Sequence, residues 1–92
     1  MSVTVRIPTT LRPMAGGNKL VDVEAGTLAE VIAALEAAHP GFADRLLDND
    51  GELRKFVNVF VDDDDVRYLD GLATPVADGL TVSIIPAVAG GF

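Results

Sequence analysis

Residues 27–39, TLAEVIAALEAAH, form the one long segment of this sequence with helical periodicity. Thr27 and Glu30 stand three residues apart at its start, which predicts a capping box. His39-Pro40 predicts its end, because the residue before a proline is disfavoured in the helical region. The larger apolar residues follow the i, i+3, i+4, i+7 spacing of a single helix face: Leu28, Val31, Ile32 and Leu35.

Most other apolar residues alternate with polar ones, as in strands that bury one face. The predicted strands are VTVRI, with Val3, Val5 and Ile7 inward; KLVDVEA, with Val21 and Val23 inward or Leu20 taking part at its start; FVNVFVDDDDV, with Val57, Val59 and Val61 opposite Phe56, Asn58 and Phe60; and LTVSIIP, with Val82 and Ile84 inward and Ser83 and Ile85 outward. The first two strands are expected to pair, and RYL is expected to pair briefly. Residues 9–18 contain Pro13, Gly16 and Gly17 and predict a loop, whereas FADRLL predicts a short helical turn.

A single helix cannot cover both faces of a sheet, so one face is expected to remain open to solvent. The element order predicts an α+β fold, a ubiquitin-like β-grasp with a mixed sheet of four to five strands packed on one main helix. The chain has 92 residues, of which 49% are hydrophobic, and this predicts one domain. We expect residues 1–87 to form it and residues 88–92 to be a flexible Gly-Gly-Phe tail.

The charge balance excludes some partners. The formal net charge is −7, with 14 acidic and 7 basic residues, which argues against binding to nucleic acid or to an anionic membrane. It fits a partner with a basic docking surface, or simply a soluble acidic protein. The start of the sequence does not resemble a signal peptide, and no stretch approaches the roughly 20 apolar residues of a membrane span, so a cytoplasmic location is expected.

No motif predicts catalysis, a metal site or a bound cofactor. The chain has no Cys, and its one histidine, His39, stands at a predicted helix end, where a capping or surface role is expected. No serine lies in a G-x-S-x-G motif. The run Asp62 to Asp65 lacks the ligand spacing of a calcium loop, so it predicts a charged turn that blocks edge-to-edge strand pairing. Gly16-Gly17 is not followed by a phosphate-loop Lys-Ser/Thr and predicts a flexible turn.

The last residues, AVAGGF, contain two adjacent glycines, which lose the most conformational entropy when they are ordered. A backbone without Cβ atoms can, however, enter a narrow channel in another protein. From Pro86 to Gly91 the chain can extend roughly 20 Å, at ~3.3–3.6 Å per residue. The tail is therefore either an element that an enzyme recognises or a terminus without a function.

Three segments, FVNVFVDDDDVR, LATPVADG and IIPAVAGG, resemble the ThiS and MoaD sulfur-carrier family. VTVRIPTTLRPMAGGNKLV is similar to the branch that serves cysteine synthesis, so the resemblance covers nearly the whole chain. It implies a carrier that is not itself an enzyme and binds no cofactor. Gly91 would provide the carboxylate that is adenylated and becomes a thiocarboxylate, with Gly90, Ala89 and Val88 recognised as the tail.

The resemblance also implies the partners. An E1-like adenylating and sulfurtransferase enzyme would use ATP to activate Gly91. In the cysteine branch, a PLP-dependent cysteine synthase supplied with O-phosphoserine provides the aminoacrylate that the thiocarboxylate attacks. A JAMM-type metalloprotease then releases cysteine from the carrier.

Phe92 departs from the family pattern, because Gly91 followed by Phe92 has an amide and no free carboxylate. We expect Phe92 to be removed first, and a JAMM-type protease is a candidate for that cleavage. Alternatively, Phe92 is a remnant of cloning or a retained anchor of a ubiquitin-like binding module or modifier. A carrier for molybdopterin, thiamin or another metabolite is a further alternative.

The resemblance implies that the strands with Phe60 and Ile85 are neighbours, which would place both side chains in one exposed apolar patch. Such a patch often marks a docking site, and acidic residues around it would steer a basic partner. The alternative is local packing under a loop.

Overall fold

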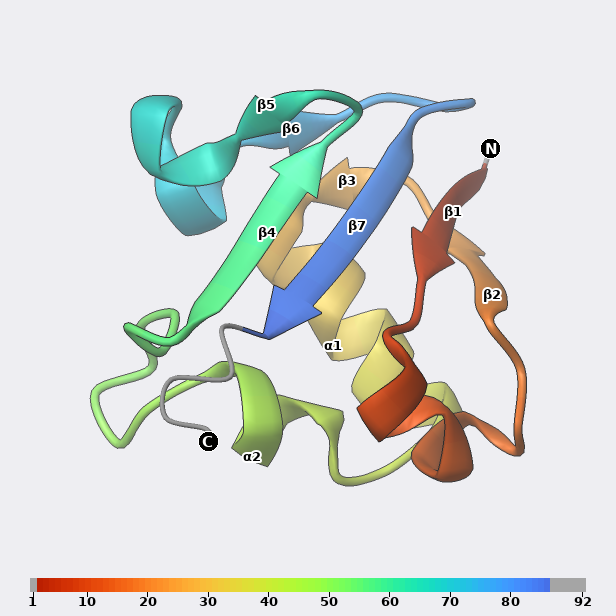
Figure 1. The fold of residues 1–92 in the computed structure, drawn as a ribbon. Helices are drawn as coiled ribbons and strands as arrows, with labels where there is room; N and C mark the ends of the chain where they lie inside the picture. Colours follow the sequence, from red (N-terminus) through yellow and green to blue (C-terminus); the bar gives the residue numbers. More distant parts are fainter. Residues whose placement is uncertain (1, 87–92) are drawn as a thin grey trace.

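Five strands form one mixed sheet in the computed structural model, which describes residues 2–86 (Figure 1). Their order is β2-β1-β7-β4-β5, and only the pairing of β1 with β7 is parallel. The bounds are Ser2–Arg6 for β1, Leu20–Glu24 for β2, Val57–Val61 for β4, Asp64–Asp65 for β5 and Thr81–Pro86 for β7. The predicted α+β fold and mixed sheet are confirmed. The predicted boundary between residues 87 and 88 lies outside the described residues.

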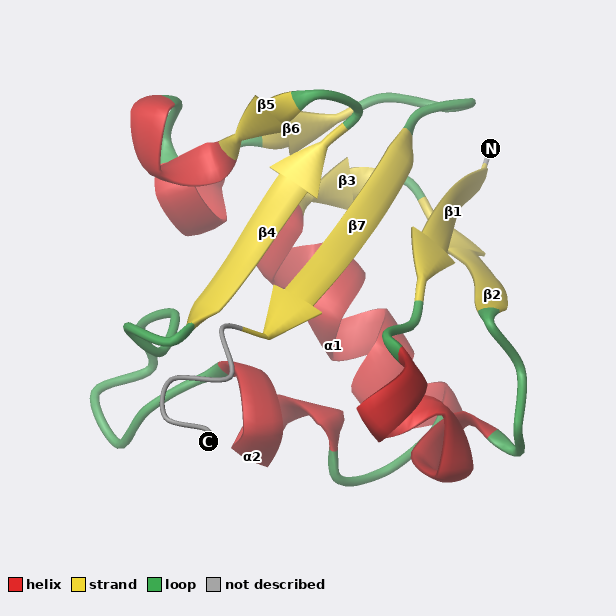
Figure 2. Cartoon of the chain, viewed as in Figure 1, coloured by secondary structure: helices red, strands yellow, loops and turns green. Residues whose placement is uncertain are grey.

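One long helix, α1 (Leu28–Ala38), crosses a single face of this sheet (Figure 2). The predicted capping box is present: the Glu30 backbone N–H donates to Thr27 Oγ1 at 3.3 Å, and the Thr27 backbone N–H donates to Glu30 Oε1 at 2.9 Å. His39 is the C-terminal cap residue, and its ring meets that of Phe42 edge-on, with the centroids 6.4 Å apart. The helix therefore begins and ends where the sequence predicts.

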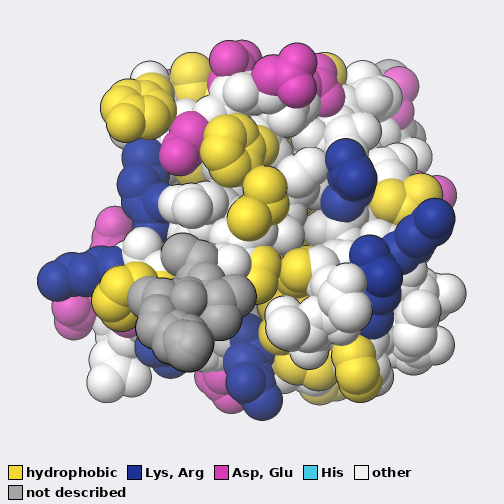
Figure 3. Space-filling view, in the orientation of Figure 1, with side chains coloured by type: hydrophobic (Ala, Val, Ile, Leu, Met, Phe, Trp, Pro, Cys, Tyr) yellow, Lys and Arg dark blue, Asp and Glu magenta, His cyan; other side chains and the backbone are white. Residues whose placement is uncertain are grey.

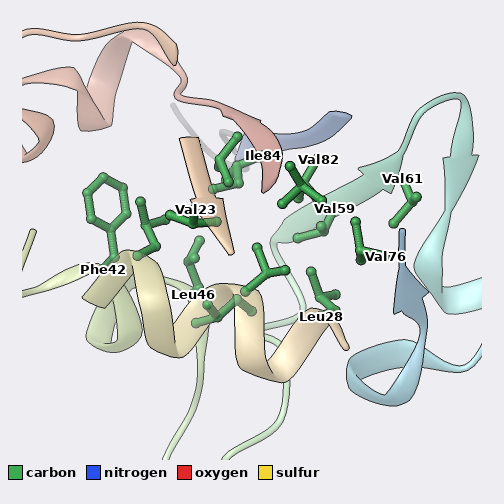
Figure 4. Packing of buried hydrophobic residues seen from close by; sticks show 14 of the residues in the cluster. Val23, Leu28, Phe42, Leu46, Val59, Val61, Val76, Val82 and Ile84 are labelled. Carbon is green, nitrogen blue, oxygen red and sulfur yellow. The ribbon is translucent and has the colours of Figure 1, made fainter. Parts of the chain in front are cut away.

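The core lies between α1 and the inner face of the sheet (Figure 4). The inward residues of the predicted strands and the helix stripe are buried, except Val21, which is half-buried. Phe42 in the short helix α2 (Phe42–Leu46) is fully buried as well. A small ribbon of β3 (Gly26–Thr27) and β6 (Pro75–Val76) holds the start of α1. In the described part of the chain, no helix is long and apolar enough to cross a membrane.

Residues 9–15 are a 3₁₀ helix, η1 (Thr9–Ala15), and so the prediction of a loop was wrong there. Leu11, Met14 and Ala15 pack against the core, which stabilises a compact turn that the prolines and glycines concealed. Gly16, with a φ of 66°, ends the turn in the left-handed conformation that glycine adopts readily.

The prediction that RYL pairs as a strand was also wrong. The strand beside β4 is β5, and Val66–Tyr68 form a 3₁₀ helix, η2, followed by another, η3 (Gly71–Ala73). Asp65 ends β5 because its Oδ1 accepts the Arg67 backbone N–H at 2.9 Å and so caps η2. The Asp run is thus a turn only at Asp62 and Asp63, and its second half is strand.

Candidate functional site

The outer face of the sheet, on the side away from α1, carries Phe60 and Ile85 on neighbouring strands. Phe60 is paired with Ser83, and Ile85 lies two residues further along β7, opposite Asn58. The two side chains are therefore diagonal neighbours on one face. Ile85 is 48% exposed and Phe60 is half-buried. The expected neighbourhood of the strands is confirmed, and the role of these residues in docking remains a prediction.

The predicted tail follows directly from this face. β7 ends at Pro86, which is paired with Val57, the first residue of β4. The chain therefore leaves the described part of the structure beside Lys55 and Phe56, which precede Val57. The sequence-predicted tail residues lie outside the described residues, and their roles stay predictions: Val88, Ala89, Gly90, Gly91 and Phe92.

Arg67 organises the segment beside this exit, and sequence analysis did not identify it. Its guanidinium donates hydrogen bonds to the backbone carbonyls of Arg54 at 2.8 Å, Lys55 at 3.2 Å and Val57 at 2.8 Å. A further hydrogen bond goes to Asn58 Oδ1. One planar side chain thus holds the residues that lead into β4. No local sequence pattern predicts this contact, because ten or more residues separate Arg67 from these carbonyls.

Charges on the outer face are unevenly distributed (Figure 3). Asp62 and Asp63 lie at one end of a shallow groove whose lining also includes Arg6, Arg12 and Lys19. In Figure 3, acidic side chains gather along the upper margin, where Figure 1 shows the turn between β4 and β5. The sequence predicts acidic residues around the patch, but they lie on only one side of it. On the β5 side, Asp65 is paired with Phe60, whereas on the β1 side Arg6 is paired with Ser83.

Asp62, in the β4–β5 turn, has a structural partner in Thr81. The Thr81 backbone N–H donates to Asp62 Oδ1 at 3.0 Å, and the Asp62 N–H donates to the Thr81 carbonyl at 2.7 Å. Across residues 2–86, no three His, Cys, Asp or Glu side chains are grouped so that they could hold a metal ion. The acidic turn is thus tied to β7 within the fold.

Comparisons with known proteins agree with this arrangement. The sequence profile of the ThiS family matches residues 5–91. The sulfur carrier protein CysO of Mycobacterium tuberculosis strain H37Rv is 54% identical over 93 residues, which cover 99% of this chain and 100% of the relative. The small archaeal modifier protein 3 of Haloferax volcanii is 40% identical over 94 residues, covering 99% of this chain and all of that protein.

A solved structure matches closely as well. A chain in the crystal structure of the Amycolatopsis orientalis BexX/CysO complex superposes with a TM-score of 0.91 at 47% identity, covering 97% of this chain and 99% of that one. Sequence and fold agree over almost the full length. The chain therefore belongs to the ThiS family, with the ubiquitin-like β-grasp fold of its CysO relatives.

Proposed function

We propose that this protein is a sulfur carrier whose Gly91 carboxylate, freed by removal of Phe92, is adenylated and converted to a thiocarboxylate that donates sulfur for cysteine synthesis. The observation that carries the proposal is the 54% identity to a sulfur carrier protein along the whole chain. The Gly90-Gly91 pair at the end of the sequence supports it.

The chemistry explains why activation must precede sulfur transfer. A carboxylate is a poor electrophile, so one of its oxygens first attacks the α-phosphate of ATP, and pyrophosphate leaves. The terminal sulfur of a persulfide on the partner then attacks the acyl-adenylate, AMP departs, and an acyl disulfide forms. A second thiol of the partner attacks the sulfur that belongs to the partner, so the S–S bond breaks and a partner disulfide forms. The other sulfur stays on the acyl carbon of Gly91 as a thiocarboxylate. Nothing in these steps requires a catalytic side chain of the carrier.

The E1-like activating enzyme would supply both ATP binding and sulfur transfer. The relative seen in the BexX/CysO complex supports the idea that a chain of this shape forms complexes with other proteins. The proximity of Phe60 and Ile85 to the start of the tail supports docking through the outer face. In this arrangement, docking presents the tail to the active site of the partner.

Phe92 must be removed before Gly91 can react, because a peptide amide offers no oxygen that attacks ATP in this way. A JAMM-type metalloprotease is suited to the cleavage, since it would later hydrolyse the same kind of Gly–X amide when cysteine is released. The cysteine would form on a PLP-dependent synthase, where the thiocarboxylate sulfur adds to an aminoacrylate made from O-phosphoserine. An acyl shift from sulfur to nitrogen then leaves cysteine joined to Gly91.

The decisive measurement is the intact mass of the protein purified from its native cells, grown with limiting and with ample sulfur. We expect loss of one phenylalanine residue and a fraction heavier by the exchange of one oxygen for sulfur. A form with one cysteine added after Gly91 would identify the acceptor. A single species that keeps Phe92 under both conditions would overturn the proposal.

A second candidate is a protein modifier, and the 40% identity to small archaeal modifier protein 3 favours it. A modifier also needs a free Gly91 carboxylate, but it ends in an isopeptide bond to a lysine of another protein. Digestion of whole-cell protein with a protease that cleaves before the tail would release branched peptides in which a lysine carries the tail residues that end in Gly91. Their detection, without any thiocarboxylate form, would favour this candidate over the carrier.

A further inference from the structure

The outer face of the sheet has an ordered change of charge along β7. At the start of β7, the row across the sheet is acidic: Asp22 is paired with Thr4, Thr4 with Thr81, and Thr81 is hydrogen-bonded to Asp62. The Thr4 hydroxyl donates to Asp22 Oδ1 at 3.0 Å, which holds that carboxylate on the face. Asp63 is exposed in the adjoining turn. This row and the turn form the acidic end of the face.

The next row across the outer face, two residues further along β7, contains both a cationic and an acidic side chain. Arg6 is paired with Ser83, and Ser83 with Phe60, which in turn faces Asp65. Beyond this row, two cationic residues lie beside Ile7, which follows β1. Arg12 Nε donates to the Ile7 carbonyl at 3.1 Å, and the Ile7 N–H donates to the Lys19 carbonyl at 2.7 Å, so both residues lie directly beside Ile7. Arg6, Arg12 and Lys19 form the cationic end of the face.

The cationic end coincides with the end from which the tail leaves. The groove lined by Arg6, Arg12 and Lys19 extends to Ile85 and Pro86. On the other side of β7, Arg67 lies against Asn58, and Arg54 and Lys55 precede the strand residue opposite Pro86. Basic residues thus lie on both sides of the exit, although acidic residues outnumber them twofold in the chain. Beside Arg54 and Lys55 they are accompanied by one carboxylate, Asp48, so the cationic excess is clearest on the side of Arg6, Arg12 and Lys19.

We infer that the partner that accepts the tail carries acidic side chains around the entrance for residues 87–91, and basic side chains at the opposite end of its docking site. The inference rests on the proposed function, since it describes the activating enzyme that adenylates Gly91. Phe60 and Ile85 provide the apolar centre between the two charged ends. A face that is acidic at one end and cationic at the other favours one orientation of the carrier on its partner. A uniformly charged face would instead attract the partner in any orientation.

The test is steady-state adenylation of the chain ending in Gly91 by the E1-like enzyme of the same organism, followed as ATP–pyrophosphate exchange. Arg6→Gln with Lys19→Gln removes two cations from one end. Asp22→Asn with Asp63→Asn removes two acids from the other, and asparagine keeps an oxygen to accept the Thr4 hydrogen bond. We expect each pair to raise KM about five-fold at low salt, with kcat unchanged, because exposed charges mainly affect encounter and orientation.

Matched controls separate this effect from net charge. Ala29→Glu with Ala33→Glu, and Ala29→Lys with Ala33→Lys, change the net charge by the same amounts on the exposed side of α1. We expect less than about a two-fold change in KM from them, because α1 lies behind the sheet. The difference between pairs and controls should disappear as salt screens the charges.

Each result decides the matter. If both outer-face pairs raise KM and the controls do not, the proposed polarity is supported. If one pair lowers KM, the partner has a single sign of charge and the inference is wrong. The inference is also wrong if the outer-face pairs and the α1 control variants change KM by the same factor. If the chain ending in Gly91 is not adenylated at all, the proposed function fails and the inference fails with it.

Discussion

Ile84 and Ile85 are consecutive residues of β7 that lie on opposite faces of the sheet. Ile84 is 4% exposed and belongs to the core, whereas Ile85 is 48% exposed on the outer face. The pleat of the strand causes this separation, because successive side chains point in opposite directions. The same substitution at these two positions therefore distinguishes stability from docking.

Ile84→Ala should destabilise the fold by about 2–5 kcal/mol, because it removes buried methyl and methylene groups and leaves a cavity. Ile85→Ala should change the free energy of unfolding by less than about 0.5 kcal/mol, since its side chain is half in solvent. Urea denaturation followed by circular dichroism measures both. A large loss of stability in Ile85→Ala would show that this residue serves the fold.

Phe60→Ala should weaken activation by the E1-like enzyme and leave the protein folded. Phe60 shares the outer face with Ile85, and a large apolar side chain at the centre of an interface contributes much of its affinity. We expect KM to rise about ten-fold or more, and the double variant with Ile85→Ala to lose still more. Equal activation rates for Phe60→Ala and the unmodified chain would contradict the docking role.

Arg67→Ala should loosen the segment that precedes β4. The substitution removes the Arg67 donor from three backbone carbonyls and from the Asn58 side chain, although the Arg54 carbonyl still accepts the Val57 N–H. Because Arg67 is exposed and water can replace part of these bonds, we expect a loss of about 0.5–1.5 kcal/mol in stability. Arg67→Lys should recover only part of it, because an ammonium group lacks the planar fork that reaches several acceptors.

Hydrogen exchange measured by mass spectrometry would locate the effect of Arg67→Ala in residues 54–58. Arg45→Ala is the control, since Arg45 is also an exposed arginine, on α2. Unchanged exchange in residues 54–58 would mean that Arg67 does not hold this segment in solution.

Thr27→Ala should lower the free energy of unfolding by about 1 kcal/mol, because the side chain caps α1 and accepts the Glu30 N–H. Glu30→Ala should lower it by less, since this substitution removes only the reciprocal bond to the Thr27 N–H. Thr10→Ala, at an exposed position in η1, serves as the control for the loss of a threonine side chain. Thermal unfolding of the three variants tests this order, and an equal loss in all of them would contradict the capping role.

Helix and strands were predictable because their signals are local. Each element has its own repeat, which gives the apolar stripe of the helix, Leu28, Val31, Ile32 and Leu35, and the alternation along the strands. The inward residues of the long strands pack as expected except Val21, which is only half-buried. The glycine pair of the tail is likewise visible in the sequence, and so is the family resemblance. The mistakes about η1 and η2 fell on short 3₁₀ helices that depend on packing and on one capping side chain. The predicted Asp turn was too long, because Asp64 and Asp65 pair with β4.

The sequence by itself determined that a single helix would cover one face of a sheet, which faces of the helix and of the long strands would turn to the core, and that Phe60 and Ile85 would point outward. Tertiary structure decided which outward residues meet. The pairing of β4 with β7 brings Phe60 beside Ile85, the parallel pairing of β1 with β7 brings Arg6 beside Ser83, and the path of η2 brings Arg67 to the start of β4. These contacts join residues far apart in the chain, and strand register, which no local pattern contains, fixes them.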